Sequence, residues 1–144
     1  MDRMERRIAN RWEEMPDIVA MVERFGAEHA CPSQVINDVN VVLDEVLSNI
    51  ISYGFEDGEQ SDILVRLDYR PGEVLVEVED AGKPFDPLKA PPPDLGVPLE
   101  ARQVGGLGIH FMKSLMDDVA YARVDGKSRL RLRKKLPPGT ANSE

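Results

Sequence analysis

The sequence predicts an α+β domain, a two-layer sandwich with helices on one face of a mostly antiparallel sheet. Three observations predict it: two apolar patterns of helical period come first, an alternating hairpin follows, and a further helix and hairpin close the chain. Because strands joined by short turns pair antiparallel, this order excludes a doubly wound parallel sheet. A length of 144 residues suits one domain with one core.

Two helices are expected in the first part of the chain. Pro16 suits a helix start, and apolar residues at helical spacing follow it to about residue 30. A second helix is expected from about Ser33 to Tyr53, where Gly54 ends it. Its apolar stripe recurs at steps of three and four: Val35, Val39, Val42, Leu43, Val46 and Ile50.

Two hairpins and a third helix complete the predicted fold. Residues 63–69 and 74–79 alternate between apolar and polar around a Pro-Gly turn, and the second of these strands runs into Asp80. Residues 81–104 are rich in proline and glycine, and a helix is expected after Gly108. The last hairpin pairs residues 119–124 with 128–136. Its arginines either decorate a solvated sheet face or meet an acidic partner: Arg129, Arg131 and Arg133.

The composition narrows the class of function. The net charge is −8 and the isoelectric point about 4.8, which argues against a direct nucleic-acid binder. A phosphate ligand would then need backbone amides, a helix N-terminus or a metal ion as its positive partner. No apolar run approaches the roughly 20 residues of a membrane helix, no secretory signal is evident, and Cys31 has no disulfide partner in the chain. We therefore expect a cytoplasmic protein without a membrane partner.

The first candidate motif lies on the second predicted helix. Glu45 and Asn49 are four residues apart, so they share a face, and they flank the apolar stripe at the edge of the core. A carboxylate there can accept a proton, and an amide oxygen can bind Mg²⁺. The alternative is that both belong to an ordinary solvated helix face.

The second motif is the segment Asp80-Ala81-Gly82-Lys83-Pro84-Phe85-Asp86. Asp80 ends a strand, and Gly82 lacks a Cβ, so a flat ligand can approach the backbone closely. Pro84 and Phe85 fix the direction of the chain and offer apolar contact. The alternative is a tight turn in which Asp80 caps backbone amides.

The third motif is Gly105-Gly106-Leu107-Gly108, immediately before a helical pattern. Small residues at a helix N-terminus expose amide N–H groups and the positive end of the helix dipole, which suits phosphate. The alternative is a flexible hinge. The segment is not a Walker loop, because no Gly-Lys-Ser/Thr follows it.

Together, in this order and spacing, the three motifs resemble the GHKL (Bergerat) ATP-binding fold. Residues 43–49 look like its N box, residues 80–86 like its first glycine box and residues 105–109 like its second. The resemblance is strongest to small bacterial anti-sigma-factor serine/threonine kinases and extends from about residue 6 to residue 136. It implies one histidine-kinase-like ATPase domain over residues 1–136. The residues after this domain, 137–144, begin with two prolines and are expected to be a flexible tail.

The resemblance also implies roles for single residues. Glu45 would be the general base that takes the proton from a protein serine or threonine, and Asn49 would bind the Mg²⁺ of Mg·ATP. Asp80 would accept from the exocyclic amine of adenine, with Gly82 beneath the ring. Residues 87–104 would form the ATP lid. The phosphates would be cradled by three glycines: Gly105, Gly106 and Gly108. From its charge and its position in the lid segment, Arg102 is a further candidate to reach the phosphates.

The implied function is that of an ATP-dependent protein serine/threonine kinase and anti-sigma regulatory factor. It would phosphorylate a STAS-type anti-sigma-factor antagonist and bind a sigma factor or another effector in a partner-switching pathway. The resemblance also allows a homodimer. The alternative is a non-catalytic switch in which ATP only sets the partner that is bound. Glu45 separates the two, because ATP binding does not require it.

Overall fold

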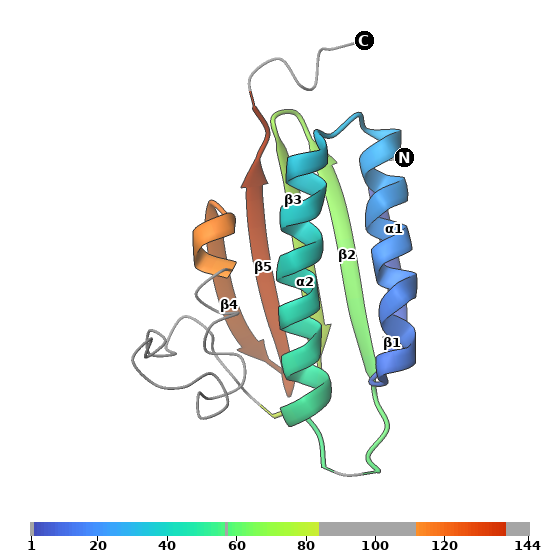
Figure 1. The fold of residues 1–144 in the computed structure, drawn as a ribbon. Helices are drawn as coiled ribbons and strands as arrows, with labels where there is room; N and C mark the ends of the chain where they lie inside the picture. The colour runs from blue at the N-terminus through green and yellow to red at the C-terminus, as the bar shows by residue number, and fades with distance from the viewer. Residues whose placement is uncertain (1, 57, 84–111, 138–144) are drawn as a thin grey trace, which may run out of the picture.

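The structure, a computed structural model, describes residues 2–56, 58–83 and 112–137. In chain order its elements are β1 (Arg3–Ala9), the 3-10 turn η1 (Trp12–Glu14), α1 (Met15–Glu28), α2 (Ser33–Tyr53), β2 (Asp62–Arg70), β3 (Glu73–Asp80), β4 (Asp118–Val124) and β5 (Lys127–Lys135). The strands form one sheet in the order β1-β2-β3-β5-β4, and every neighbouring pair is antiparallel. Figure 1 shows α1 and α2 on one face of this sheet, so the predicted α+β sandwich is confirmed.

α2 crosses the middle of the sheet and organises the core (Figure 1). It ends where predicted, because the Gly54 N–H still reaches the Ile50 carbonyl at 2.8 Å but no helical residue follows. Its apolar stripe packs against inward-facing residues of the central strands: Ile63, Val65, Leu67, Val74, Val76, Val78, Leu130 and Leu132. Among the helices in the described ranges, none combines the length and the apolar composition needed to cross a membrane.

Strand β1 was not predicted. It lies at one edge of the sheet and pairs with β2 from Arg3 opposite Asp68 to Ala9 opposite Asp62. Only Ile8 of its seven residues is buried, and four of the others carry charge. An edge strand of this kind lacks the apolar alternation that identifies a strand in a sequence, although charged side chains are typical of protected edges.

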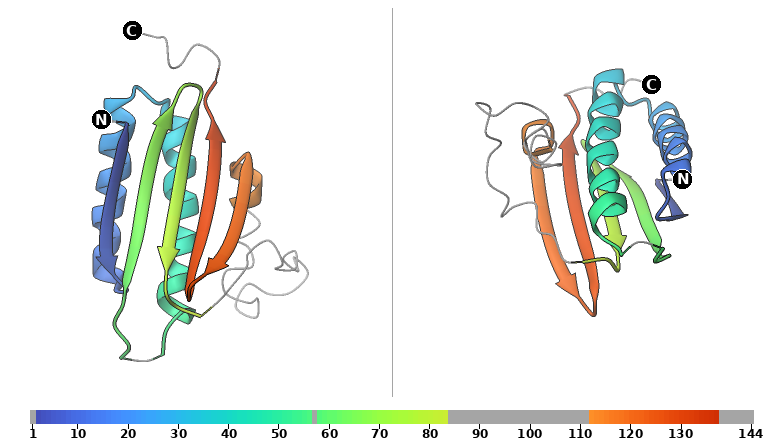
Figure 2. Two further views of the ribbon diagram at one scale, coloured as in Figure 1. Left: turned by 180° about the vertical axis from the view of Figure 1, so that it is seen from behind. Right: turned by 60° about the horizontal axis from the view of Figure 1, so that its bottom comes forward.

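Figure 2 (left) shows the face of the sheet opposite the helices. The side chains on this face form a network of ion pairs. Arg66 contacts Glu5 at 3.0 Å and Glu77 at 2.5 Å, and Arg131 contacts Glu77 at 2.8 Å. Arg129 and Arg133 also pair with acidic residues on this face, while Leu130 and Leu132 point into the core. The predicted alternation of arginine and leucine is confirmed. Such exposed pairs contribute at most about 1 kcal/mol each.

A buried polar cluster joins α2, β5 and the short helix at residues 112–115. Asp38 is only 5% exposed, its Oδ2 lies 3.0 Å from Nζ of Lys134, and its Oδ1 accepts from Gln34 at 2.8 Å. The same Nζ donates to the carbonyl of Leu115 at the end of the short helix. The cluster therefore attaches the end of the third helix to both layers of the domain.

Candidate functional site

The structure describes part of the predicted site. Glu45 and Asn49 lie on the C-terminal half of α2 and are both partly buried, as expected for the edge of the core. Asp80 is the last residue of β3, and Gly82 follows it in a buried position. The remaining predicted residues lie outside the described ranges, as does the lid at residues 87–104: Pro84, Phe85, Arg102, Gly105, Gly106, Leu107 and Gly108.

Asp80 is a buried carboxylate held by its own turn. It is 7% exposed, and its Oδ1 accepts a hydrogen bond from the Gly82 N–H at 2.8 Å. Burial raises the pKa of this carboxyl group, and the Gly82 hydrogen bond and the nearby Arg123 charge act in the opposite direction. Asp80 therefore caps a backbone amide, as the alternative interpretation stated. Within the described residues no hydrogen bond reaches Oδ2, which can accept from a ligand.

The turn after Asp80 is attached to the end of α2. The Lys83 N–H donates to the Gly54 carbonyl at 2.8 Å. A Cβ on Gly82 would lie 2.6 Å from that carbonyl oxygen and 3.0 Å from Oδ1 of Asp80. The absence of a Cβ at Gly82 predicts that a ligand can approach the backbone there. In the structure, the Gly54 carbonyl already occupies this space, and the contact attaches the second motif to the end of the helix that carries the first.

We expect Gly82→Ala to weaken the domain by about 1–2 kcal/mol, because the added methyl group cannot fit beside the Gly54 carbonyl without a backbone shift. Thermal unfolding of the two proteins measures this loss. Ala81→Ser is the matched control, because Ala81 is the adjacent residue and is exposed. Equal midpoints for Gly82→Ala and the wild type would contradict the close contact.

Three side chains of the last hairpin adjoin this turn, and the sequence analysis missed them. Nη1 of Arg123 donates to the Gly82 carbonyl at 2.7 Å and to Oγ of Ser128 at 2.8 Å. Ser128 is 6% exposed, lies opposite Asp80 in the sheet and is 2.9 Å from the Tyr121 hydroxyl. Polar residues at inward-facing positions of an alternating strand are unusual. This departure from the apolar pattern is the sequence signal that could have identified Arg123 and Ser128.

Glu45 has the environment of a proton acceptor. Partial burial raises the pKa of its carboxyl group, and the negative charge of Asp44 raises it further. A carboxylate with a raised pKa binds a proton more strongly than an ordinary glutamate and is a better general base near neutral pH.

These residues fit Mg·ATP in two respects. The buried acceptor of Asp80 suits an N–H donor on a flat ring, such as the amine of adenine. The side-chain oxygen of Asn49 is a ligand that Mg²⁺ accepts, and it would be joined by phosphate oxygens of the nucleotide. Within the described ranges no three His, Cys, Asp or Glu side chains lie together as metal ligands. Mg²⁺ is commonly bound in this way, by one or two protein groups and by phosphates.

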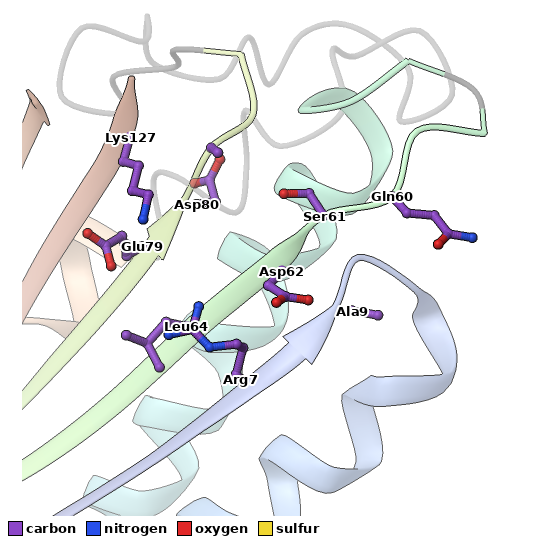
Figure 3. Close-up of a pocket in the computed structure, with 10 residues that line it drawn as sticks. Arg7, Ala9, Gln60, Ser61, Asp62, Leu64, Glu79, Asp80 and Lys127 are labelled. Carbon is purple, nitrogen blue, oxygen red and sulfur yellow. The ribbon is translucent and has the colours of Figure 1, made fainter. Parts of the chain in front are cut away.

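A cavity of about 460 Å³ lies on the face of the sheet opposite α1 and α2 (Figure 3). Arg7, Leu64 and Glu79 project into it from three neighbouring strands, and Asp80 borders it. Glu45, Asn49 and Gly82 do not line it. The cavity is therefore distinct from the predicted nucleotide site, which lies on the helix side.

Comparison with known proteins places this geometry in a family. Residues 8–134 match the family model described as a histidine kinase-like ATPase domain. The chain belongs to this family. The predicted GHKL resemblance is thereby confirmed, and the five-stranded sheet with its helices agrees with it.

Relatives within this ATPase family include named kinases and anti-sigma factors. The chain is 35% identical over 100 residues to the serine/threonine-protein kinase BtrW of Bordetella bronchiseptica, covering 69% of this chain and 70% of the relative. It is 30% identical over 109 residues to an anti-sigma F factor of Clostridium botulinum, covering 70% and 71%.

A solved structure supports the fold of the ATPase family. The RsbU and RsbW domains of a Mycobacterium tuberculosis protein superpose with a TM-score of 0.69 at 14% identity. The match covers 94% of this chain and 33% of that chain. This identity is too low to transfer an activity, and the likeness concerns the fold.

Proposed function

We propose that this protein is an ATP-dependent protein serine/threonine kinase and anti-sigma regulatory factor. Its substrate would be a STAS-type anti-sigma-factor antagonist, and its other partner a sigma factor or similar effector in a cytoplasmic partner-switching pathway. The observation that carries the proposal is membership of the ATPase family together with relatives named as serine/threonine kinase and anti-sigma factor. Glu45 adds a group suited to proton transfer.

In the proposed reaction, a serine or threonine hydroxyl oxygen of the antagonist attacks the γ-phosphorus of ATP. A new P–O bond forms to that oxygen, the bond to the β–γ bridging oxygen breaks, and ADP leaves. Glu45 would accept the hydroxyl proton, and Asn49 would help to hold Mg²⁺, which supplies positive charge for the phosphates. Asp80 and Gly82 would fix the adenine. The glycines at 105, 106 and 108 and the lid at 87–104, with Arg102, would complete the phosphate site.

The test is a phosphotransfer assay. The protein is mixed with Mg·ATP and with candidate STAS-type antagonists, and phosphoserine and phosphothreonine are identified by mass spectrometry. We expect one phosphate on one residue of the antagonist. The absence of product with every antagonist tested, combined with partner affinity that changes with ATP, would replace the kinase by a non-catalytic switch. No change in the melting midpoint at millimolar Mg·ATP would contradict both functions.

A further inference from the structure

The backbone of Gly82 is held by side-chain contacts on both its N–H and its carbonyl group. Its N–H donates to Oδ1 of Asp80 at 2.8 Å, and its carbonyl accepts from Nη1 of Arg123 at 2.7 Å. The Gly54 carbonyl oxygen packs against the Cα of Gly82 on a third side. Three elements therefore meet at one residue: the end of α2, the end of β3 and the edge strand β4.

We propose that Arg123 is a positioning residue that fixes the Asp80–Gly82 turn for recognition of the adenine amine. The inference rests on the proposed function, because it takes Asp80 as the acceptor for that amine. Arg123 acts through the backbone of the turn and does not itself bind the base. Its guanidinium links the turn to Ser128 at 2.8 Å, and Ser128 lies opposite Asp80 in the sheet.

The geometry gives Arg123 a role that other arginines of the last hairpin do not have. The side chains of Arg129, Arg131 and Arg133 pair with carboxylates on the outer face of the sheet. Arg123 is at an inward-facing position, and its described hydrogen bonds go to a backbone carbonyl and a hydroxyl. Those acceptors are neutral, so the two hydrogen bonds define where the turn lies. The charge of the same guanidinium also favours the ionised form of Asp80.

Loss of Arg123 should cost little stability, because the residue is exposed and its two hydrogen bonds are only partly buried. It removes one donor from the Gly82 carbonyl, and that carbonyl can then accept from water. The turn, however, loses one of its attachments beside Asp80. A displacement of the acceptor by a fraction of an ångström weakens a directional hydrogen bond far more than it weakens general contacts of a ligand.

The experiment compares two nucleotides that differ only at the group in question. Purine riboside 5′-triphosphate lacks the exocyclic amine of ATP and keeps its ring, ribose and phosphates. Calorimetry with Mg²⁺ gives the dissociation constants of both for the wild type, Arg123→Met and Arg123→Lys. Arg131→Met is the matched control, because it removes an arginine of the same hairpin on the opposite face.

We expect Arg123→Met to weaken ATP about tenfold and the amine-free nucleotide less than about twofold, with Arg123→Lys intermediate. Arg131→Met should bind both nucleotides as the wild type does. Equal losses for the two nucleotides would overturn the inference, because Arg123 would then act on the phosphates, the ribose or the fold. Unchanged ATP affinity in Arg123→Met would overturn it as well.

Two further results separate this inference from the proposed function. If the wild type binds neither nucleotide, the proposed function fails, and the inference fails with it. If the wild type binds ATP without preference over the amine-free nucleotide, ATP binding stands and the inference is overturned. Melting midpoints without nucleotide check that each variant is folded, and Arg123→Gln replaces Arg123→Met if the latter is not.

Discussion

Asp80→Asn is expected to weaken ATP binding roughly 100-fold while the domain stays folded. The asparagine oxygen can still accept from the Gly82 N–H, which lies 2.8 Å from Oδ1 of Asp80. Its amide nitrogen then occupies the place of the second carboxylate oxygen, so a donor faces the donating amine of adenine. The favourable hydrogen bond becomes a repulsive contact between two donors. The variant therefore loses the preference for nucleotides that carry the adenine amine.

The fold of Asp80→Asn should be at least as stable as the wild type at neutral pH. Because burial raises the pKa of Asp80 in the folded state, its stabilising contribution is present below the ordinary aspartate pKa and is lost as pH rises through the raised value. Above that window the folded wild type carries a buried charge that the variant lacks.

Melting midpoints with and without millimolar Mg·ATP measure both effects at once. The wild type should gain several degrees with nucleotide, and Asp80→Asn should gain much less, as a 100-fold weaker affinity requires. Glu79→Gln is the matched control: it removes the adjacent carboxylate, which pairs with Arg129 at 3.0 Å on the outer face. An Asp80→Asn protein that is stabilised by ATP as strongly as the wild type would remove Asp80 from the site.

Glu45→Gln is expected to reduce phosphotransfer by about 10²–10⁴-fold and to leave the affinity for ATP unchanged. Glutamine keeps the size and polarity of the side chain but cannot accept the proton of the attacking hydroxyl group. The measurement is the single-turnover rate of antagonist phosphorylation, with ATP affinity determined in parallel. An unchanged rate in Glu45→Gln would show that another group, or water, removes the proton.

The pH dependence of phosphotransfer gives an independent check on Glu45. The rate should rise with pH as this carboxyl group ionises, with a midpoint above the ordinary glutamate pKa of about 4.3. Asp44→Asn should lower that midpoint, because the exposed Asp44 raises the pKa of Glu45 through its negative charge. Glu45→Gln should abolish this limb of the profile. A profile that Asp44→Asn does not move would contradict Glu45 as the titrating base.

The sequence predicted those elements whose buried face carries an apolar pattern. α2 begins and ends at the predicted residues, and both hairpins lie where alternation placed them. β1 could not be predicted because an edge strand buries few apolar side chains. Only Ile8 of this strand is buried, and its backbone hydrogen bonds are made with β2. Its place in the sheet is a property of the fold and not of its local pattern.

The candidate site likewise contains residues that a local pattern identifies and contacts that only the fold determines. Glu45, Asn49, Asp80 and Gly82 stand in short motifs, so they could be named from the sequence. The contact of Arg123 with Gly82 depends on the register of three strands and on the position of β4 at the sheet edge. Residues 41 positions apart meet there, and no local pattern in a single sequence gives that register.

The polar cluster at Asp38 and the contact at Gly54 attach α2 to its surroundings at two points. The helix is attached to the third helix through Asp38 and Lys134 near one end, and to the Asp80 turn through Gly54 at the other. Since each helical residue advances about 1.5 Å, these attachments lie about 24 Å apart. The length of α2 therefore sets the distance between the third helix and the Asp80 turn. One residue inserted between its attachments would turn Glu45 and Asn49 by about 100° relative to one attachment, so the length of this helix is as constrained as the residues on it.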